Sequence, residues 1–271
     1  MKKFIIIGLL MALLPLNLQA QLCEVENTAF KAGEYVDYDL YFDWGIIWKK
    51  VGSASLSTEK TIYNGQPAYD IRLMALGSKE ADMLMKLRDT LQVYMNERLE
   101  PLYYKKAAEE GSYYSVDEAW YSRENGVSKV HQRRTRPGVA DYTPLINDIE
   151  DSRCIYDMLS IIARARNFSV EHFYEGHKTT LPLATGRAVD DETLTCLGDA
   201  IIKAKDGHKY ACKGFSLYAI TKGEKREILR FYITDDANRL PVRIDIDLKV
   251  GSAKAYLKGV KGNAHPLTPV K

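Results

Sequence analysis

The sequence predicts a mainly β, β-rich α+β fold in which a large curled antiparallel sheet, or open half-barrel, packs around one long helix. Three observations lead to this prediction. Apolar and polar residues alternate with a period of two along most of the chain, which is typical of strands with one buried side. Turn signals separate these runs. One segment has the spacing of an amphipathic helix, and a long helix beside a many-stranded sheet has to cover the apolar face of that sheet.

Residues 1–20 are predicted to form a cleavable signal peptide. Lys2 and Lys3 precede an apolar run, and a short polar stretch ends at Ala20, which is the order of parts that the secretion machinery reads. No later stretch reaches the roughly 18 to 20 apolar residues that a transmembrane helix needs. We therefore expect cleavage after Ala20, a single domain over residues 21–271, and a periplasmic location.

A lipid anchor on Cys23 is disfavoured by the residue before it. Lipidation signals take a small residue at that position, where this chain has Leu22. Removal of the signal peptide also takes two of the 38 basic residues and none of the 36 acidic ones, so 36 of each remain. Nucleic-acid-binding domains carry a basic excess, so we expect no nucleic-acid partner.

Strand periodicity first appears near the start of the mature chain. Val36, Tyr38, Leu40 and Phe42 fall on one face, and Tyr41 lies on the other with polar residues. Weaker alternation continues in four segments, which are 71–75, 91–95, 113–130 and 229–233. The turn signals between strands are Asn64-Gly65, Asn125-Gly126, Asp206-Gly207 and the segment 235–238.

The C-terminal hairpin gives the most specific expectation. The strand at 229–233 should turn at 235–238 and return over 242–250, with Pro241 at the start of the returning strand, where a missing backbone donor costs least. Strict alternation fixes the register, because a one-residue slip would bury a row of charges. The residues expected to face inward are Val242, Ile244, Ile246, Leu248 and Val250, and those expected to face outward are Arg243, Asp245, Asp247 and Lys249.

The segment 152–166 has helical spacing instead, behind a capping candidate at Asp151 or Ser152. Its apolar residues at i, i+3, i+4 and i+7 are Ile155, Met158, Leu159 and Ile162. The pattern predicts an amphipathic helix of about four turns that buries this face against the sheet. A shorter helix is expected after Ser78, and its inward residues would be Met83, Leu84 and Leu87.

Four cysteines remain in the mature chain and allow three full pairings; they are Cys23, Cys154, Cys196 and Cys212. The Asp206-Gly207 turn would set Cys212 opposite Ile201. Cys196 lies five residues from Ile201, so an unbroken strand puts the sulfurs of Cys196 and Cys212 on opposite faces. A bridge between them would need a bulge, for which Gly198 is the candidate. The pairing stays open.

Several segments resemble a known family. They are Phe30-Lys31-Ala32-Gly33-Glu34, Leu87-Arg88-Asp89, Tyr156-Asp157-Met158-Leu159-Ser160 with Ala165-Arg166, and Thr234-Asp235-Asp236-Ala237-Asn238-Arg239-Leu240-Pro241-Val242-Arg243-Ile244 leading to Val250-Gly251-Ser252. Over nearly all of its mature length, the chain is similar to the exported bacterial proteins grouped as domain of unknown function 3108. The resemblance implies a β-rich envelope protein, similar in outline to the half-barrels of periplasmic lipoprotein carriers. It implies no established activity and no catalytic residues.

No catalytic residue, metal or cofactor is expected, and we expect the protein not to be an enzyme. The chain has no His-Glu-x-x-His, no Gly-x-Ser-x-Gly and no Gly-rich phosphate loop. The five-residue gap between His172 and His177 would turn the two rings apart on a helix or a strand, so we expect locally hydrogen-bonded histidines. Asp235, Asp236 and Asn238 could offer oxygens to a hard cation, but we expect them to close a turn by bonding backbone amides.

Aromatic residues supply the candidate contacts with a ligand or partner. Trp44, Ile46, Ile47 and Trp48 gather two indoles and two isoleucines at the expected end of a strand, where a cavity mouth or a partner surface could lie. Trp120 is the fifth candidate. Aromatic residues are also favoured in strands for cross-strand packing alone, which is the alternative interpretation.

The only dense basic stretch contains Arg133, Arg134 and Arg136. Guanidinium groups suit a phosphate-bearing partner such as an anionic lipid head group. The alternative is a solvated hairpin end or loop, which ordinary surface composition favours.

Three functions fit the sequence. The first, which we favour, is a non-catalytic periplasmic binding or carrier module that holds an apolar or amphipathic envelope molecule in a cavity inside the sheet. The second is an envelope assembly or scaffold protein with a filled core, which binds another protein through its aromatic strand ends. The third is a hydrolase using Glu109 and Glu110, which has the least support because neighbouring residues on a strand point apart.

Overall fold

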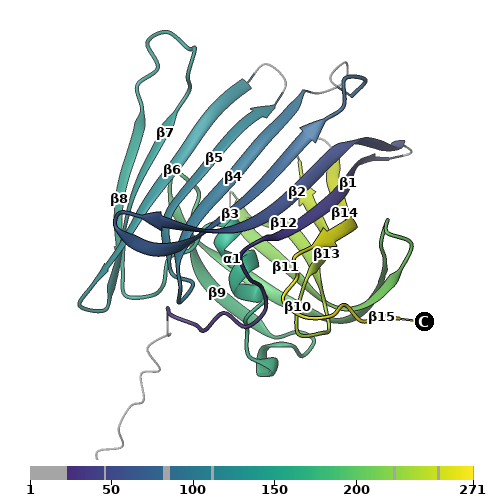
Figure 1. Ribbon diagram of the computed structural model, residues 1–271. Coiled ribbons are helices and arrows are strands. Elements are labelled where there is room, and N and C mark those ends of the chain that lie inside the picture. The colour runs from purple at the N-terminus through teal and green to yellow at the C-terminus, as the bar shows by residue number, and fades with distance from the viewer. Residues whose placement is uncertain are drawn as a thin grey trace, which may run out of the picture.

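In the computed structural model, one curled antiparallel sheet surrounds a short buried helix (Figure 1). The structure describes residues 23–45, 47–81, 86–110, 113–221, 224–248 and 251–270. The expected signal peptide therefore lies outside the described residues, together with Leu22 of the lipidation argument. Of the other residues named above, Ile46, Met83, Leu84, Lys249 and Val250 also lie outside them.

The strands form two consecutive meanders. The first contains β1 (Glu34–Trp44), β2 (Ile47–Tyr63), β3 (Gln66–Gly77), β4 (Leu87–Asn96), β5 (Pro101–Glu110), β6 (Tyr113–Glu124), β7 (Val127–Thr135) and β8 (Leu145–Asp151). The second contains β9 (Lys178–Ala184), β10 (Val189–Lys203), β11 (Lys209–Thr221), β12 (Glu224–Thr234), β13 (Pro241–Asp247) and β14 (Ser252–Lys261). The remaining elements are α1 (Met158–Ala165), the 3-10 helix η1 (Val170–His172) and β15 (Pro269–Val270), which pairs with β11.

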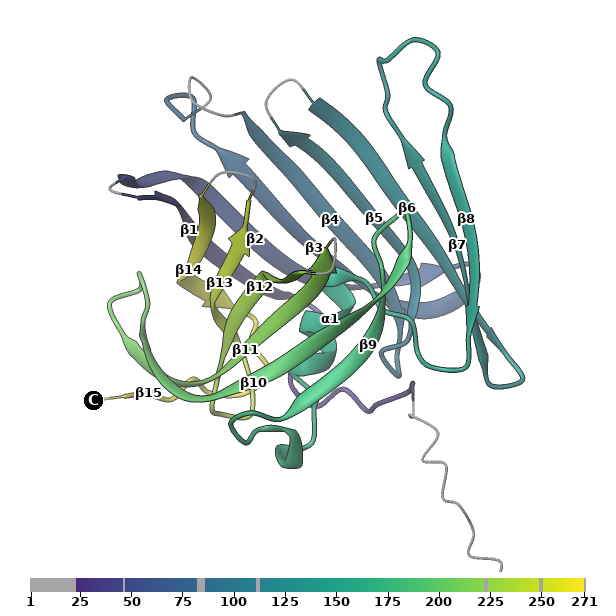
Figure 2. The ribbon, with the colours of Figure 1, turned by 180° about the vertical axis from the view of Figure 1, so that it is seen from behind.

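The first strand of the first meander pairs with the last strand of the second, and this pairing joins the two meanders. β1 pairs with β14, from Tyr35 opposite Lys261 to Asp43 opposite Ser252. The first and last long strands of the chain therefore lie side by side in the middle of the sheet, and β8 and β9 form its two edges (Figure 2). The predicted large, curled and open antiparallel sheet is confirmed.

Local sequence explains the tight hairpins. Asn64-Gly65 and Asn125-Gly126 both have positive φ angles, of 48° and 80° in the first pair and 51° and 81° in the second. A two-residue hairpin turn of this kind needs a left-handed backbone at both positions, which asparagine and glycine tolerate best. Both turns are therefore confirmed.

The C-terminal hairpin forms in the predicted register. Pro241 begins β13, Val242 and Ile244 are buried, and Ile246 is partly buried. Arg243 and Asp245 remain partly exposed and pair with each other at 2.6 Å. The strand ends at Asp247 instead of continuing to residue 250. A turn closed by the hydrogen bond from the Leu248 N–H to the Gly251 carbonyl separates it from β14.

The predicted long amphipathic helix is wrong. α1 covers only Met158–Ala165, and every residue from Leu159 onward is buried, so the helix is enclosed on all sides. It begins late because Asp157 accepts hydrogen bonds from the N–H groups of Leu159 and Ser160, and the Ser160 hydroxyl accepts one from the Asp157 N–H. This is a capping box. Tyr156 is already held in an extended bridge beside β9, so Ile155 is buried outside the helix.

The shorter helix expected after Ser78 falls partly on residues outside the described ranges. Among the described ones, Leu87 begins β4 and is not helical. No helix in the described ranges has the length and apolar character needed to cross a membrane.

The predicted two-residue turn at Asp206-Gly207 is also wrong. β10 and β11 last pair at Lys203 and Lys209, and residues 204–208 form a longer loop held by a hydrogen bond from the Ala204 N–H to the His208 carbonyl. Cys212 therefore faces Ala200 instead of Ile201. The register does shift at Gly198, the candidate position for a bulge, and the φ of Gly198 is 80°.

One disulfide joins Cys23 to Cys154. Cys196 and Cys212 are both buried and carry free thiols. Each of the three pairings left open by the sequence would need two disulfides, and only one is present. The disulfide ties the segment before β1 to the segment that leads into α1.

Candidate functional site

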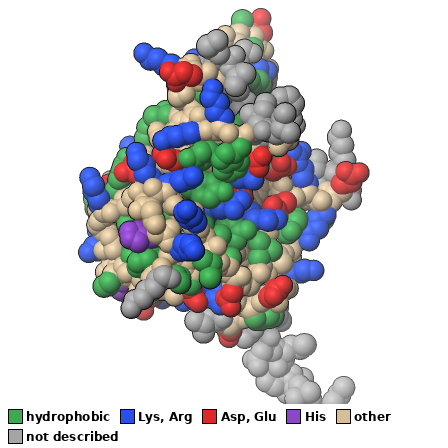
Figure 3. Space-filling model, turned by 90° about the vertical axis from the view of Figure 1, so that its right-hand side faces the viewer, with side chains coloured by type: hydrophobic (Ala, Val, Ile, Leu, Met, Phe, Trp, Pro, Cys, Tyr) green, Lys and Arg blue, Asp and Glu red, His purple; other side chains and the backbone are tan. Residues whose placement is uncertain are grey.

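Trp48 belongs to a group of aromatic and basic side chains on the outer face of the sheet, which we call the outer aromatic cluster. Its members come from β1, β2, β12, β13, β14 and the 204–208 loop, and they are Tyr41, Trp48, Lys205, Tyr232, Arg243, Lys254 and Tyr256. They share a face because β1, β14, β13 and β12 are neighbours in the sheet, and residues opposite each other on paired strands point the same way. Figure 3 shows this side of the molecule, where basic side chains lie among hydrophobic ones.

The rings of the outer aromatic cluster pack on each other. Tyr41 and Trp48 stack with centroids 5.1 Å apart, and Tyr256 meets both edge to face, at 5.9 and 6.1 Å. Trp48 nevertheless keeps 48% of its surface exposed. The predicted neighbours of Trp48 add nothing to this description, because Ile46 lies outside the described residues and the structure does not describe the side chains of Trp44 and Ile47.

Cations sit over these rings. The Lys205 ammonium lies 4.7 Å from the Tyr41 centroid, Arg243 lies 5.1 Å from Tyr256, and Lys254 lies 5.4 Å from Trp48. Such cation–π contacts are worth about 0.5 to 1 kcal/mol each where water has access. The surface therefore combines partly exposed aromatic rings with cations, of which Arg243 pairs with Asp245 and Lys254 pairs with Asp43.

Trp120 lies in a different place, in a row of rings that crosses the outer face of the first meander. The row contains Tyr63, Tyr94, Tyr103, Trp120 and His131, with successive centroids 4.7, 5.9, 5.5 and 5.4 Å apart. The three tyrosines stack nearly parallel. A sugar would need a free ring face, whereas these rings cover the faces of their neighbours. For Trp120, cross-strand packing is the interpretation that the geometry supports.

The three arginines of the basic stretch do not meet at one point. Arg133 lies on the outer face, 5.4 Å from the Trp120 ring, and its guanidinium bonds Glu118 at 2.7 Å. Burial raises the pKa of Glu118, but hydrogen bonds from Arg133 and Tyr103 outweigh it and lower that pKa overall.

The other two arginines have different surroundings. Arg134 points to the inner face, where its guanidinium lies 3.2 Å from Asp117 and 3.1 Å from the Ser115 hydroxyl. Arg136 lies 4.1 Å from the Tyr113 ring centroid. Arg133 and Arg134 thus already pair with carboxylates within the protein, whereas Arg136 packs on an aromatic ring. The anion contact stays a prediction.

The segments that resemble the family meet in a buried polar contact that the sequence analysis did not foresee. The Arg166 guanidinium forms two hydrogen bonds with the Glu34 carboxylate, at 2.5 and 2.9 Å, and two with the Asn238 carbonyl, at 3.0 and 3.2 Å. It also lies 4.8 Å from the Phe30 ring. The side chains of Arg166 and Glu34 are only 3% and 1% exposed. We call this contact, made by Glu34, Arg166 and Asn238, the polar lock.

The Asp-Asp-Ala-Asn segment beside the polar lock closes a turn, as predicted. Asp236 accepts hydrogen bonds from the Asn238 N–H at 3.0 Å and from the Thr234 hydroxyl at 2.7 Å, and its second oxygen accepts one from the Thr268 N–H. Asn238 in turn bonds Pro266 and His265. Within the described ranges, no group of three or more His, Cys, Asp or Glu residues is arranged to hold a metal.

The two histidines differ from the expectation in one respect. Their rings meet edge to face with centroids 5.0 Å apart, because the intervening residues form an irregular loop instead of a helix or strand. His172 contacts the Ser169 carbonyl, and His177 contacts the Tyr174 hydroxyl at 2.8 Å. The predicted local hydrogen bonding is confirmed, and the predicted separation of the rings is wrong.

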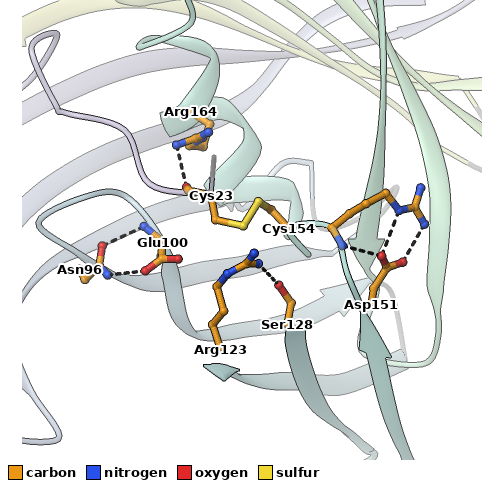
Figure 4. The surroundings of a disulfide bond; sticks show 9 residues. Cys23, Asn96, Glu100, Arg123, Ser128, Asp151, Cys154 and Arg164 are labelled. Carbon is orange, nitrogen blue, oxygen red and sulfur yellow. Dashed lines mark hydrogen bonds and ion pairs between the residues drawn. A yellow bond between two sulfur atoms is a disulfide. The ribbon is translucent and has the colours of Figure 1, made fainter. Parts of the chain in front are cut away.

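Two small cavities lie within the described part of the chain. The larger one, of about 70 Å³, lies beside the Cys23–Cys154 disulfide and is also lined by Glu100, Tyr121, Arg123, Ser128 and Tyr156. Arg123 donates to the Ser128 hydroxyl at 2.7 Å near its wall, and Arg164 donates to the Cys23 carbonyl (Figure 4). The second, of about 10 Å³, lies between α1 and the sheet next to Arg166.

One buried carboxyl group lacks a partner among the described residues. Glu192 of β10 is only 3% exposed, and its Oε2 atom has no hydrogen-bond partner there. Burial raises the pKa of Glu192 to about 7, and the neighbouring carboxylates of Asp190 and Asp191 add to the rise. This group therefore changes its charge near neutral pH.

These features define a mainly β, barrel-like protein with an open sheet, a short central helix and a polar lock that joins distant segments. Residues 37–258 match the family described as "Protein of unknown function (DUF3108)", and the chain belongs to this family. No curated protein matches the chain.

A solved structure has a similar fold. It is the crystal structure of a beta-barrel-like protein of domain of unknown function DUF1849 from Brucella abortus, which is 11% identical in sequence. The similarity has a TM-score of 0.56 and covers 88% of this chain and 100% of that one. At this identity, the similarity establishes the fold alone.

Proposed function

We propose that the protein is a non-catalytic assembly or scaffold module of the bacterial envelope, which binds another envelope protein through the outer aromatic cluster. The observation that carries the proposal is the composition of this surface. Tryptophan, tyrosine and arginine are the residues that most often dominate binding energy at protein interfaces, and Trp48, Tyr256 and Arg243 lie together here. The envelope location rests on the expected signal peptide.

The carrier function favoured by the sequence would need room for its ligand. Pockets that enclose drug-sized ligands have volumes of about 300 to 1,000 Å³, and the two best-formed cavities within the described ranges have about 70 and 10 Å³. Apolar side chains from α1 and from both meanders occupy the described interior. This favours the second of the three functions, in which the core is filled and the outer surface does the binding.

The absence of catalysis is part of the same proposal. Glu109, one member of the acidic pair considered for a hydrolase, lies 2.5 Å from the Lys86 ammonium. The Glu109 carboxylate is thus already engaged by a cation within the protein. This supports a role in binding.

The test compares three forms of the protein purified from its native envelope after chemical crosslinking. They are the wild type, the double variant Trp48→Ala/Lys205→Ala, and the control variant Ile62→Ala, which removes an exposed apolar side chain on β2 away from the cluster. We expect one envelope protein to be crosslinked by the wild type and the control, and at least tenfold less of it by the double variant. Equal crosslinking by all three forms would contradict the proposal.

The same preparations test the carrier function. Solvent extraction and mass spectrometry of the wild type should find no small molecule at a stoichiometric amount. A lipid recovered at one molecule per protein would favour the carrier instead.

A further inference from the structure

The two edge strands of the sheet, β8 and β9, differ in whether another segment covers their free side. On the edge of β9, the Tyr156 N–H bonds the Pro182 carbonyl at 3.0 Å, and the Ala184 N–H bonds the Tyr156 carbonyl at 2.7 Å. Pro182 itself has no N–H to offer. The edge of β9 is thus covered by the chain and interrupted by a proline, two of the ways in which proteins prevent unwanted pairing at a sheet edge.

Within the described ranges, the backbone edge of β8 is neither paired with a further segment nor interrupted by a proline, although the Asn147 side chain donates to the Arg187 carbonyl of the β9–β10 loop at 3.2 Å. β8 pairs with β7 in an unbroken register from Leu145 to Asp151, and it contains no proline or bulge. Among the described residues, no backbone hydrogen bond joins its other side to a further segment. It is therefore a seven-residue strand with a row of backbone donors and acceptors on one side that another strand could use.

The outward side chains of β8 give this edge a definite character. Ile146, Asp148 and Glu150 alternate on the outer face, where their exposed fractions are 61%, 72% and 64%. Asp148 lies 2.7 Å from His131, and Glu150 lies 3.4 Å from Lys129, both on β7. On the free side of β8, the same carboxylates face no described strand.

From this geometry, we propose that β8 accepts an extended segment of a protein partner as an added antiparallel strand, and that this segment carries basic residues opposite Asp148 and Glu150 and an apolar residue opposite Ile146. Strand addition uses backbone hydrogen bonds for affinity and alternate side chains for specificity. Opposite charges on directly facing residues of paired strands stabilise the pairing. The inference rests on the proposed function, since it names the chemistry of a protein partner at a second surface.

A second copy of the chain fits this edge poorly. Antiparallel pairing of two β8 strands about their centre would place Asp148 opposite Asp148 and Ile146 opposite Glu150. Like charges directly across a strand pair are destabilising. Charge complementarity therefore selects a basic partner over a second copy of this protein.

The probe is a capped seven-residue peptide in which lysine, lysine and valine occupy alternate positions and threonine fills the others. Binding to the full mature chain is followed by NMR from the shifts of the backbone amides. We expect the amides of β8 to shift, and the dissociation constant to rise at least tenfold when the peptide carries N-methyl groups on the amides that would bond β8. Equal binding of the N-methylated peptide would overturn the proposal, because simple charge attraction would then explain it.

Charge reversal provides the matched variants. Asp148→Lys/Glu150→Lys should bind the lysine peptide at least tenfold more weakly and should bind a peptide with glutamate in place of lysine instead. The control Glu59→Lys/Glu97→Lys changes the net charge by the same amount on β2 and on the β4–β5 turn, and it should bind the lysine peptide like the wild type. Loss of binding in both variants, or in neither, would contradict strand addition at β8.

Two further measurements separate the alternatives. Shifts confined to segments other than β7 and β8 would overturn the proposal, as would a concentration-dependent dimer abolished by Asp148→Lys/Glu150→Lys. The crosslinking experiment with the Trp48 variant does not involve β8, so failure of strand addition leaves the role of the outer aromatic cluster to be judged by its own result.

Discussion

The polar lock shows how single residues connect distant parts of the chain. Arg166 is separated from Glu34 by 132 positions and from Asn238 by 72, yet its guanidinium bonds both. The sequence identified the segments that contain all three residues through the family resemblance. Their contact could not be predicted, because spacing along a chain carries no information about pairing over such separations. The polar lock shows that the three segments, although remote in the sequence, are in direct contact in the fold.

Breaking the lock should be costly. Removal of one partner from a buried ion pair typically destabilises a protein by about 3 to 5 kcal/mol, because the remaining charge stays buried without compensation. We expect this loss in the free energy of unfolding, measured with urea, for Glu34→Gln and for Arg166→Met. The exposed pair Lys60–Glu97 is the control, and Glu97→Gln should cost no more than about 1 kcal/mol. Similar losses in the two pairs would mean that the lock is not a buried ion pair.

Glu192 should make stability depend on pH. Its pKa of about 7 in the folded protein lies above its ordinary value of 4.5, so its neutral form stabilises the fold fully below pH 4.5, and this contribution is lost as the pH rises through 7. We expect the wild type to lose about 1 to 3 kcal/mol relative to Glu192→Gln between pH 4.5 and pH 8. Urea unfolding at both pH values measures it. If the free energy of unfolding changed by the same amount in both proteins between the two pH values, the raised pKa of Glu192 would be contradicted.

The outer aromatic cluster was only partly visible in the sequence. Trp48 was singled out because it belongs to a dense aromatic segment. Tyr41 and Tyr256 were not, although each stands on the solvent side of an alternating strand, where an aromatic residue is the signal that could have revealed them. Which of these residues meet depends on the pairing of β1 with β14, and alternation within one strand cannot reveal its neighbour.

At the scale of elements, α1 differs most from its prediction. Ile155 fits the helical spacing, but the capping box of Asp157 and Ser160 and the bridge of Tyr156 to β9 start the helix later. Hydrophobic spacing cannot distinguish a helix residue from one in a buried extended segment. Strands were predicted more reliably, because every residue of a strand contributes to the alternating pattern. Contacts with other segments mainly change where a strand ends.

Leu159 provides the test of how α1 packs. It is 1% exposed, and replacing a fully buried leucine with alanine costs about 2 to 5 kcal/mol where the site cannot collapse. We expect a loss in this range for Leu159→Ala in urea unfolding. Ile62→Ala, at an exposed strand position, should change stability by less than about 0.5 kcal/mol. A comparably small change at Leu159 would show that α1 is not enclosed by the sheet.

At the scale of the whole molecule, the disulfide closes a long loop. Cys23 and Cys154 are 131 residues apart, and removal of a native disulfide typically costs about 2 to 5 kcal/mol. We expect Cys23→Ser/Cys154→Ser to lose stability in this range. A reducing agent should destabilise the wild type by a similar amount and leave the double variant unchanged. A further loss in the reduced variant would point to an effect of the reductant elsewhere.

The pairing of β1 with β14 also sets an order of folding. Each meander joins strands that are neighbours in the sequence, and such local contacts form quickly. β1 has to wait for β14, so one of its sides has no partner until nearly the whole chain has been synthesised. During that interval the nascent protein exposes a long unsatisfied strand, Glu34–Trp44, which other chains could capture. A strand at the centre of the finished sheet is thus a free edge until β14 pairs with it.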